Sequence, residues 1–390
     1  MDRKTAPSSR LEVKPGSARR AWLAAAAGLL LWHGAPAAPV PMADLDAWSA
    51  AKAMGIGANI GNTLDNTTHW ETGWGNPSIT HAFIANLAKL GFKTVRLPVA
   101  WDTYARNGRI PEEKLARVAE VVDWITGAGM FCVVNIHWDG GWIDSSNRQR
   151  FASTYATFSA DAEQKFVAYW TQIATRLRDR NELVAFEGLN EETHFEGEGS
   201  AAKSYETLTR VNQLFVDTVR RTGGNNAKRL LIVPGYATDF LKTVNARYKL
   251  PVDPAPGKLL LSVHYYTPWS FAGMIRDEAW SKVQRTWGSD ADVAELQRLF
   301  DALQEFCTRN DIPAFVGEFG VVDSKEQPSR VRWMTAVAQA ALARKMVPVL
   351  WDTGGDLKRA PPYGASPALV EVLQALRACR DCANSDAPTR

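Results

Sequence analysis

The sequence predicts an α/β protein whose single folded domain is a (β/α)8 barrel, or TIM barrel, preceded by an N-terminal signal peptide. Eight short apolar runs alternate with amphipathic stretches along the 390 residues, 46% of which are hydrophobic. No linker or low-complexity tract divides the chain, and eight βα units leave no room for a second domain. A doubly wound open sheet is the structural alternative, but no Gly-rich phosphate loop follows the first run.

The N-terminus is expected to be a secretory signal over residues 1–37. A pair of arginines precedes an apolar run over 21–32, which is too short for a membrane span of about 20 residues. Small residues then provide an A-x-A pattern with cleavage after Ala37. An uncleaved membrane anchor is the alternative, and the arginine pair also resembles a twin-arginine export signal. We expect a secreted or periplasmic protein with a mature domain over 38–390 that has no membrane contact after cleavage.

The predicted strands and helices alternate from the start of the mature chain to its end. The crossover over 237–250 has the weakest helical pattern. The strands are expected over 55–61, 92–99, 131–138, 183–191, 230–236, 259–266, 314–320 and 347–351. The clearest helices are expected over 111–128, 161–180, 205–221, 292–309, 329–345 and 366–380.

The charge of the mature chain argues against a nucleic-acid partner. The full sequence has a net charge of +3, but removal of residues 1–37 takes away six Lys/Arg and two Asp/Glu, which leaves a net charge of −1. No basic patch remains, so a neutral polymer such as a polysaccharide fits better. We expect a monomer.

The four cysteines suggest an oxidising compartment. We interpret Cys132 and Cys307 as buried thiols, and Cys379 and Cys382, in a C-x-x-C pattern, as a terminal bridge. Four reduced thiols are the alternative. A zinc site would need two more ligands near the terminal pair, and the sequence offers none there.

Chemically active side chains collect at the ends of the predicted strands. In a (β/α)8 barrel these ends meet at one rim, where reacting groups gather. Polar groups are costly to bury unless they are paired, so a barrel without a functional site would not need many polar side chains at this rim. The strands end at Arg96, His137, Trp138, Asn190, Glu191, His264, Tyr266, Glu318 and Trp351.

Two of these residues, Glu191 and Glu318, form a carboxylate pair across the barrel mouth, which suits glycosidic bond cleavage. One carboxyl must stay protonated and the other ionised, so their surroundings must differ. Arg96 and the hydroxyl of Tyr266 are placed to keep Glu318 ionised, while Asn190 is placed to donate to a sugar 2-hydroxyl.

Three other glutamates lie close to Glu191 in the sequence. Glu187 is expected deeper in the strand as a buried hydrogen-bonding residue, and strand alternation places Glu192 on the opposite side from Glu191. Glu196 follows a few residues later. We therefore select Glu191. Although His137 and His264 share the rim, no H-E-x-x-H pattern is present, and we expect no metal and no cofactor.

Seven segments in order resemble glycoside hydrolase family 5, the cellulase family of clan A. The segments are GIGANIGNTLD (55–65), VRLP (95–98), NIHWDGGW (135–142), FEGLNE (186–191), HYY (264–266), GEFG (317–320) and WD (351–352). Each segment is a weak motif alone, but the whole series on successive strands is specific. The segment at 61–65 and WGNP at 74–77 resemble the endo-β-1,4-glucanase and xyloglucanase branch.

The resemblance implies a retaining double displacement with Glu191 as general acid/base and Glu318 as nucleophile. It also implies that several rim residues contact the substrate, and tryptophans past strand ends add flat surfaces on which sugars stack. The expected substrate-binding residues are Arg96, His137, Asn190, His264, Tyr266, Trp351, Trp138, Trp142 and Asn62.

The sequence therefore predicts a secreted endo-β-1,4-glucanase that hydrolyses a β-glucan polysaccharide. Xyloglucan, mixed-linkage β-glucan and β-mannan are alternative substrates of the same site. A non-catalytic carbohydrate-binding protein with the same barrel is the alternative from another class, and the presence of both carboxylates with their partners argues against it.

Overall fold

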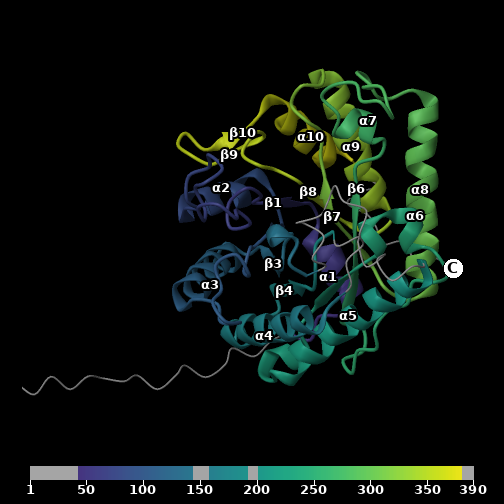
Figure 1. Cartoon of the computed structure of the whole chain (residues 1–390). Helices are drawn as coiled ribbons and strands as arrows, with labels where there is room; N and C mark the ends of the chain where they lie inside the picture. Colours follow the sequence, from purple (N-terminus) through teal and green to yellow (C-terminus); the bar gives the residue numbers. More distant parts are fainter. Residues whose placement is uncertain (1–42, 144–157, 192–200, 380–390) are drawn as a thin grey trace, which may run out of the picture. The chain divides into compact units, whose positions relative to one another are not determined.

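The eight apolar runs form a closed barrel of parallel strands in a computed structural model that describes residues 43–143, 158–191 and 201–379. Each strand pairs with the next one along the chain, and β8 pairs with β1 to close the ring. Helices surround the strands (Figure 1). The predicted (β/α)8 barrel is confirmed. Its strands are β1 Gly57–Asn59, β2 Thr94–Leu97, β3 Phe131–Asn135, β4 Val184–Glu187, β5 Leu231–Pro234, β6 Leu259–Tyr265, β7 Ala314–Phe319 and β8 Val347–Leu350.

The strands are shorter than the apolar runs suggested, because several runs leave the ladder before their polar ends. β4 stops at Glu187, four residues before Glu191. The register also shifts between Val263 and His264 in β6, and again between Val316 and Phe319 in β7. Such irregularities turn side chains out of the regular alternation. The rim residues therefore lie partly on loops and bulges rather than on regular strand.

The helices follow the amphipathic stretches, and several begin at a side-chain cap. Ser159 accepts a hydrogen bond from Ala162 N at the start of α4, and Ser289 forms a capping box with Asp292 at the start of α8. The weak crossover over 237–250 holds a helix of a single turn, α6. The helices are α1 Ala47–Met54, α2 His81–Leu90, α3 Glu112–Gly127, α4 Ala160–Arg176, α5 Ala201–Arg221, α6 Phe240–Thr243, α7 Trp269–Ala272, α8 Asp290–Arg309, α9 Gln327–Ala343 and α10 Pro367–Ala378.

Smaller elements lie in the loops after the strands. A two-stranded antiparallel sheet pairs β9 with β10 in the segment that follows β8. Three short 3-10 helices follow β3, α5 and β5. These elements are η1 Asp139–Gly141, η4 Gly224–Ala227, η5 Tyr236–Thr238, β9 Leu357–Lys358 and β10 Gly364–Ala365.

Helix α1, which the sequence pattern did not single out, covers the N-terminal end of the barrel. Its buried residues Ala47, Ala50 and Met54 belong to one apolar cluster with Phe131 and Val347, the first residues of β3 and β8. Small side chains let the helix approach the strand ends closely. Because this end is filled with apolar side chains, a polar site can open only at the C-terminal ends of the strands.

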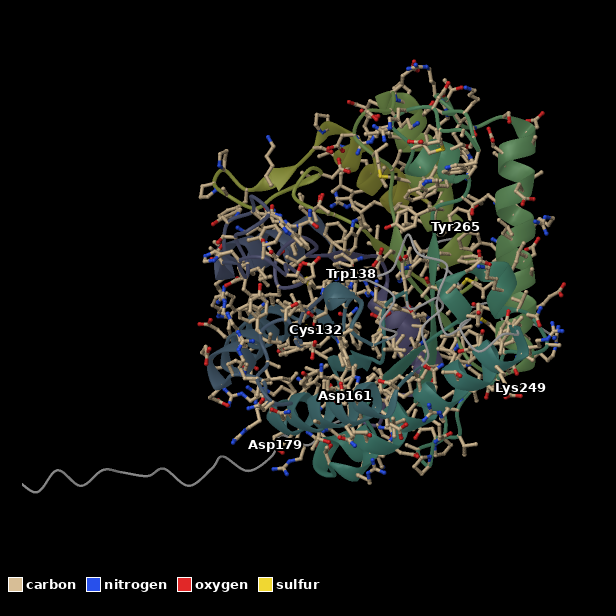
Figure 2. All side chains as sticks on the ribbon, in the orientation of Figure 1. Cys132, Trp138, Asp161, Asp179, Lys249 and Tyr265 are labelled. Atoms are coloured by element: carbon tan, nitrogen blue, oxygen red, sulfur yellow. The ribbon has the colours of Figure 1, made fainter. Side chains whose placement is uncertain are left out.

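Two of the cysteines are free and buried, namely Cys132, labelled in Figure 2, and Cys307. Cys379 is disulfide-bonded, and Cys382 lies outside the described residues, as does the predicted signal segment over 1–37. Over the ranges that the structure describes, no helix combines the length and the apolar character needed to cross a bilayer.

Candidate active site

Glu191 and Glu318 meet at the C-terminal end of the barrel. Glu318 is the penultimate residue of β7, and Glu191 follows β4 after a three-residue turn. One carboxylate oxygen of each glutamate and a ring nitrogen of His264 all lie within 4.8 Å of one another. Figure 2 labels Trp138, which follows β3 and lines the same cavity as the two glutamates. The two carboxyl groups therefore face one small space.

Glu318 is buried and accepts hydrogen bonds on both of its oxygens. Arg96 Nη1 donates to Oε1 at 2.8 Å, and the Tyr266 hydroxyl donates to Oε2 at 2.9 Å. Burial raises the pKa of Glu318, while the positive charges of His264 and Arg96 act against that rise. Both hydrogen bonds are made to the carboxylate form. The pKa of Glu318 is raised overall by burial, and Arg96, His264 and Tyr266 limit that rise.

Arg96 is fully buried and links four polar side chains under the site. Its Nε donates to Glu187 Oε2 at 2.6 Å, and its Nη1 donates to both Asn59 Oδ1 and Glu318 Oε1. Its Nη2 donates to Asn190 Oδ1 at 2.8 Å, which turns the amide nitrogen of Asn190 away from the guanidinium. Burial opposes the charge of Arg96, but the adjacent carboxylates of Glu187 and Glu318 raise its pKa. The guanidinium therefore sets the orientation of both Glu318 and Asn190.

A layer of polar side chains beneath Arg96 was only partly foreseen. Glu187 has no exposed surface and accepts hydrogen bonds from Arg96, Asn135 and Ser262, in agreement with its expected role as a buried hydrogen-bonding residue. Sequence reasoning missed Asn59, Asn135 and Ser262. The available signal was an uncharged polar residue inside each of three otherwise apolar strands, because such a residue needs a partner when it is buried.

Glu191 stands in different surroundings from Glu318. Its side chain is 45% exposed, compared with 6% for Glu318. Glu191 Oε1 lies 2.6 Å from His264 Nδ1, which is also 3.7 Å from Glu318 Oε2. Burial opposes protonation of His264, but the carboxylates of Glu318 and Glu191 outweigh it and raise the pKa of His264. Glu191 thus faces solvent while Glu318 is enclosed, so the two carboxyls have different surroundings.

A cavity of about 640 Å³ opens above these groups. Two tryptophans on its wall, Trp138 and Trp269, are 37% and 51% exposed. Trp351 stacks on His137 with ring centroids 5.6 Å apart and planes 7° apart. The described residues that line the cavity include His137, Trp138, Asn190, Glu191, Tyr266, Trp269, Glu318, Asp323, Trp351, Asp352, Thr353 and Asp356.

The predicted site residues divide into those that line the cavity, those that lie behind it and those that lie apart from it. Arg96 and His264 are behind the lining, where they bind the two glutamates. Trp142 is not among the lining residues and packs edge-on against Tyr169 at 5.4 Å. Asn62 is also absent from the lining, and its carbonyl accepts a hydrogen bond from Asn76. Glu192 and Glu196 lie outside the described residues.

His137 is expected to be neutral in this site. Burial, together with the positive charges of Arg96 and His264, lowers the pKa of its imidazole well below the usual value. The ring therefore offers a flat, uncharged surface beside Trp351. An uncharged ring suits contact with a neutral sugar better than an imidazolium would, because no buried charge must be compensated.

The three groups nearest the reaction space are also potential metal ligands. Within the described parts of the chain, Glu191, His264 and Glu318 are the one group of acidic and histidine residues with ligand atoms in mutual reach. Glu191 Oε1 and both oxygens of Glu318 are, however, already bound by His264, Arg96 and Tyr266.

Most of the chain matches a known protein family. The family described as Cellulase (glycosyl hydrolase family 5) matches residues 55–356. The chain belongs to glycosyl hydrolase family 5. It is therefore a glycoside hydrolase, and the expected family resemblance is confirmed.

Relatives of this family 5 enzyme include several glucanases. The cellulase/esterase CelE of Acetivibrio thermocellus is 35% identical over 320 residues, which cover 80% of this chain and 37% of that protein. Endoglucanase B of Clostridium cellulovorans is 33% identical over 318 residues, which cover 80% of this chain and 69% of that protein. A xyloglucan-specific endo-β-1,4-glucanase of Bacteroides ovatus is 30% identical, with 80% of this chain and 66% of that protein covered. The chain thus spans little more than a third of the first relative and about two thirds of the others.

Solved structures of the same family superpose on the barrel. A broad-specificity endoglucanase from Ruminococcus champanellensis with bound cellotriose has a TM-score of 0.75 and 30% identity. The match covers 86% of this chain and 99% of that one. The similarity therefore extends over almost all of a family 5 catalytic domain.

Proposed function

We propose that this family 5 enzyme is an endo-β-1,4-glucanase that hydrolyses its substrate with retention of anomeric configuration. The separation of the two carboxyls carries this proposal. Retaining glycosidases place their carboxyl groups about 5–5.5 Å apart, whereas inverting enzymes separate them by about 6.5–9.5 Å to admit a water molecule. Oxygens of Glu191 and Glu318 that lie within 4.8 Å of each other fit the retaining geometry. The endoglucanases among the relatives support the choice of substrate.

In the first step, Glu318 attacks the anomeric carbon and the protonated Glu191 delivers its proton to the departing glycosidic oxygen. A glycosyl ester on Glu318 and a shortened glucan with a free hydroxyl result. In the second step, Glu191 takes a proton from water, the water oxygen bonds to the anomeric carbon, and the Glu318 carboxylate leaves. Two inversions give net retention.

The neighbouring side chains have separate tasks in this scheme. Arg96 and Tyr266 hold the attacking carboxylate in place, since both donate to it. Asn190, oriented by Arg96, presents its amide nitrogen to the sugar 2-hydroxyl, a contact that strengthens as the oxocarbenium-like transition state develops. Trp351 supplies a flat face for the reacting sugar.

Endo action fits the shape and lining of the cavity. The cavity is open to solvent at half-exposed tryptophans, Trp138 and Trp269, so a polymer is able to continue past the reacting sugar on either side. Xyloglucan is the second candidate substrate, because one relative is specific for it. Mixed-linkage β-glucan and β-mannan complete the set to be tested.

We further propose that residues 1–37 direct export and are removed, leaving a monomeric catalytic domain over 38–390 in the periplasm or outside the cell. The pattern of arginines, apolar run and A-x-A site supports this. N-terminal sequencing of the protein recovered from outside the cytoplasm tests it. An N-terminus at residue 1 on the exported protein would contradict it.

The experiment for the main proposal is reducing-sugar release and viscosity loss by the purified mature enzyme. Substrates are carboxymethylcellulose, xyloglucan, mixed-linkage β-glucan and glucomannan. A rapid viscosity loss on the cellulose derivative, with little sugar release, is the expected endo pattern. Glu318→Gln should lose at least about 10³-fold in kcat while it still binds the polymer, because its fold and sugar contacts remain. Wild-type rates in that variant would refute the assignment of the nucleophile.

A further inference from the structure

An exposed hairpin beside the cavity carries apolar side chains that the catalytic scheme does not use. We call residues 275–283 the Trp280 hairpin. Backbone hydrogen bonds join Glu278 and Ser281 in both directions, at 3.0 and 3.3 Å, so Ala279 and Trp280 form its two-residue turn. Trp280 is 68% exposed at that turn. Trp side chains are mostly buried on average, so a tip position requires an explanation.

Apolar exposure is concentrated in this part of the chain. Nine large hydrophobic side chains are exposed among the described residues, and three of them, Trp269, Ile275 and Trp280, fall within twelve consecutive positions. Single exposed apolar residues are ordinary, but a group of them marks a binding surface. Trp269 already lines the cavity. Ile275 and Trp280 belong to the hairpin, which begins two residues after the lining residue Gly273.

The base of the hairpin is fixed to the cavity wall. Gln284 N donates to Ser270 O at 3.0 Å, which joins the end of the hairpin to α7. The buried ammonium of Lys325 donates to Gln284 O at 2.8 Å and to Ser270 O at 3.3 Å, and so ties both to the loop after β7. Residues Trp269 and Gly273 of this region line the cavity. The hairpin is therefore a braced extension of that wall.

The charges on the hairpin cancel in pairs. Arg276 Nε lies 2.9 Å from Glu278 Oε1, and Lys282 Nζ lies 3.1 Å from Asp277 Oδ2. Asp277 also accepts a hydrogen bond from Val283 N, which stiffens the second arm. The four charged residues of the hairpin therefore carry no net charge. A flat, uncharged ligand with hydroxyl groups at its edge fits this surface, and a charged ligand gains nothing from it.

We propose that the Trp280 hairpin is a polysaccharide-binding platform outside the catalytic cavity, where the indole of Trp280 stacks on a neutral β-glucan chain held by the active site. This inference rests on the proposed glucanase function. A polymer is longer than a cavity of about 640 Å³, so its chain must pass over the rim. An exposed indole on a braced turn presents a flat face, and with only two side-chain torsions it loses little conformational entropy on binding. The platform acts on long chains and not on short oligosaccharides.

The test compares Trp280→Ala with the wild-type enzyme on hydroxyethylcellulose, a neutral soluble polymer, and on cellotetraose. We expect the ratio of the two kcat/KM values, polymer over tetrasaccharide, to fall by a factor of about 3 to 10 through a higher KM for the polymer. Val252→Ala is the matched control, because Val252 is 77% exposed in the segment before β6, at the opposite end of the barrel. Trp269→Ala should lower both kcat/KM values, since Trp269 lines the cavity.

A ratio within twofold of wild type in Trp280→Ala would overturn the platform. Sedimentation that shows a wild-type dimer and a Trp280→Ala monomer would overturn it too, because the indole would then contact a second copy of the chain. Failure of the glucanase proposal looks different: the wild-type enzyme would cleave neither substrate. Unchanged midpoints of thermal unfolding in both variants show that the comparison concerns binding and not folding.

Discussion

Substitution of Arg96 tests the site most directly, because its guanidinium affects both the free energy of unfolding and the ionisation of Glu318. It has no exposed surface and contacts two carboxylates, Glu187 at 2.6 Å and Glu318 at 2.8 Å. Arg96→Met removes the charge while it keeps much of the volume. Arg96→Lys keeps the charge but not the planar fork that reaches four acceptors. Comparison of the two variants therefore distinguishes the effect of the positive charge from that of the guanidinium geometry.

The expected cost in stability follows from the burial of both partners. Removing one member of a buried ion pair leaves an uncompensated charge and costs about 3–5 kcal/mol. In Arg96→Met two buried carboxylates lose their partner, so the free energy of unfolding at neutral pH should fall by at least about 3 kcal/mol. Glu318 then favours protonation, so this deficit should shrink as the pH falls. Arg96→Lys should lose less at neutral pH.

The same change should move the acid limb of the activity profile. Burial raises the pKa of Glu318 and the charge of Arg96 opposes that rise, so loss of the charge raises the pKa further. The ionised fraction at a given acidic pH then decreases, and the acid limb of kcat/KM shifts to higher pH in Arg96→Met. Arg96→Lys should show a lower kcat with a smaller shift. An acid limb in Arg96→Met that coincides with wild type would refute the proposed electrostatic role.

Three further predictions concern the cavity. Glu191→Gln should lower kcat/KM, which reports the first step, by at least about 10²-fold on cellotetraose but far less on an aryl cellobioside with an acidic phenol, because that leaving group needs no proton. Equal losses of kcat/KM on both substrates would contradict the acid role. Asp323→Asn should raise kcat/KM on the anionic polymer carboxymethylcellulose a few-fold at low salt, because Asp323 is a 73% exposed carboxylate on the cavity wall and repels that polymer. The kcat/KM on hydroxyethylcellulose should stay unchanged. A gain on carboxymethylcellulose that persists at 1 M salt would argue against this charge repulsion. EDTA should not change the rate of hydrolysis. Added Zn²⁺ should inhibit the enzyme by binding Glu191, His264 and Glu318. A loss of activity in EDTA that Zn²⁺ restores would instead show that the enzyme requires a metal.

The sequence by itself determined the barrel and the positions of its main polar residues. Apolar runs of strand length alternate with helical periodicity, and this local pattern depends only on which faces each segment must bury. The rim residues were found because parallel strands of a barrel present their ends at one side. Glu191 and Glu318 therefore appeared as a pair from their positions at the ends of two strands.

Only the tertiary structure decided how these residues are arranged around the reaction space. Asn59, Asn135 and Ser262 are polar residues in apolar runs, and their purpose appears only when the closed barrel brings them to Arg96 and Glu187. Such contacts join strands that are far apart in sequence, so no local periodicity reports them.

Loop direction was equally beyond the sequence pattern. Trp138 and Trp142 lie four residues apart, yet Trp138 lines the cavity and Trp142 packs against Tyr169. The Trp280 hairpin and helix α1 were likewise absent from the sequence-based expectations. Each of these features depends on which surface remains uncovered after the barrel closes. The hydrophobic periodicity of each segment determines which side chains are buried, and long-range packing determines where the remaining side chains point.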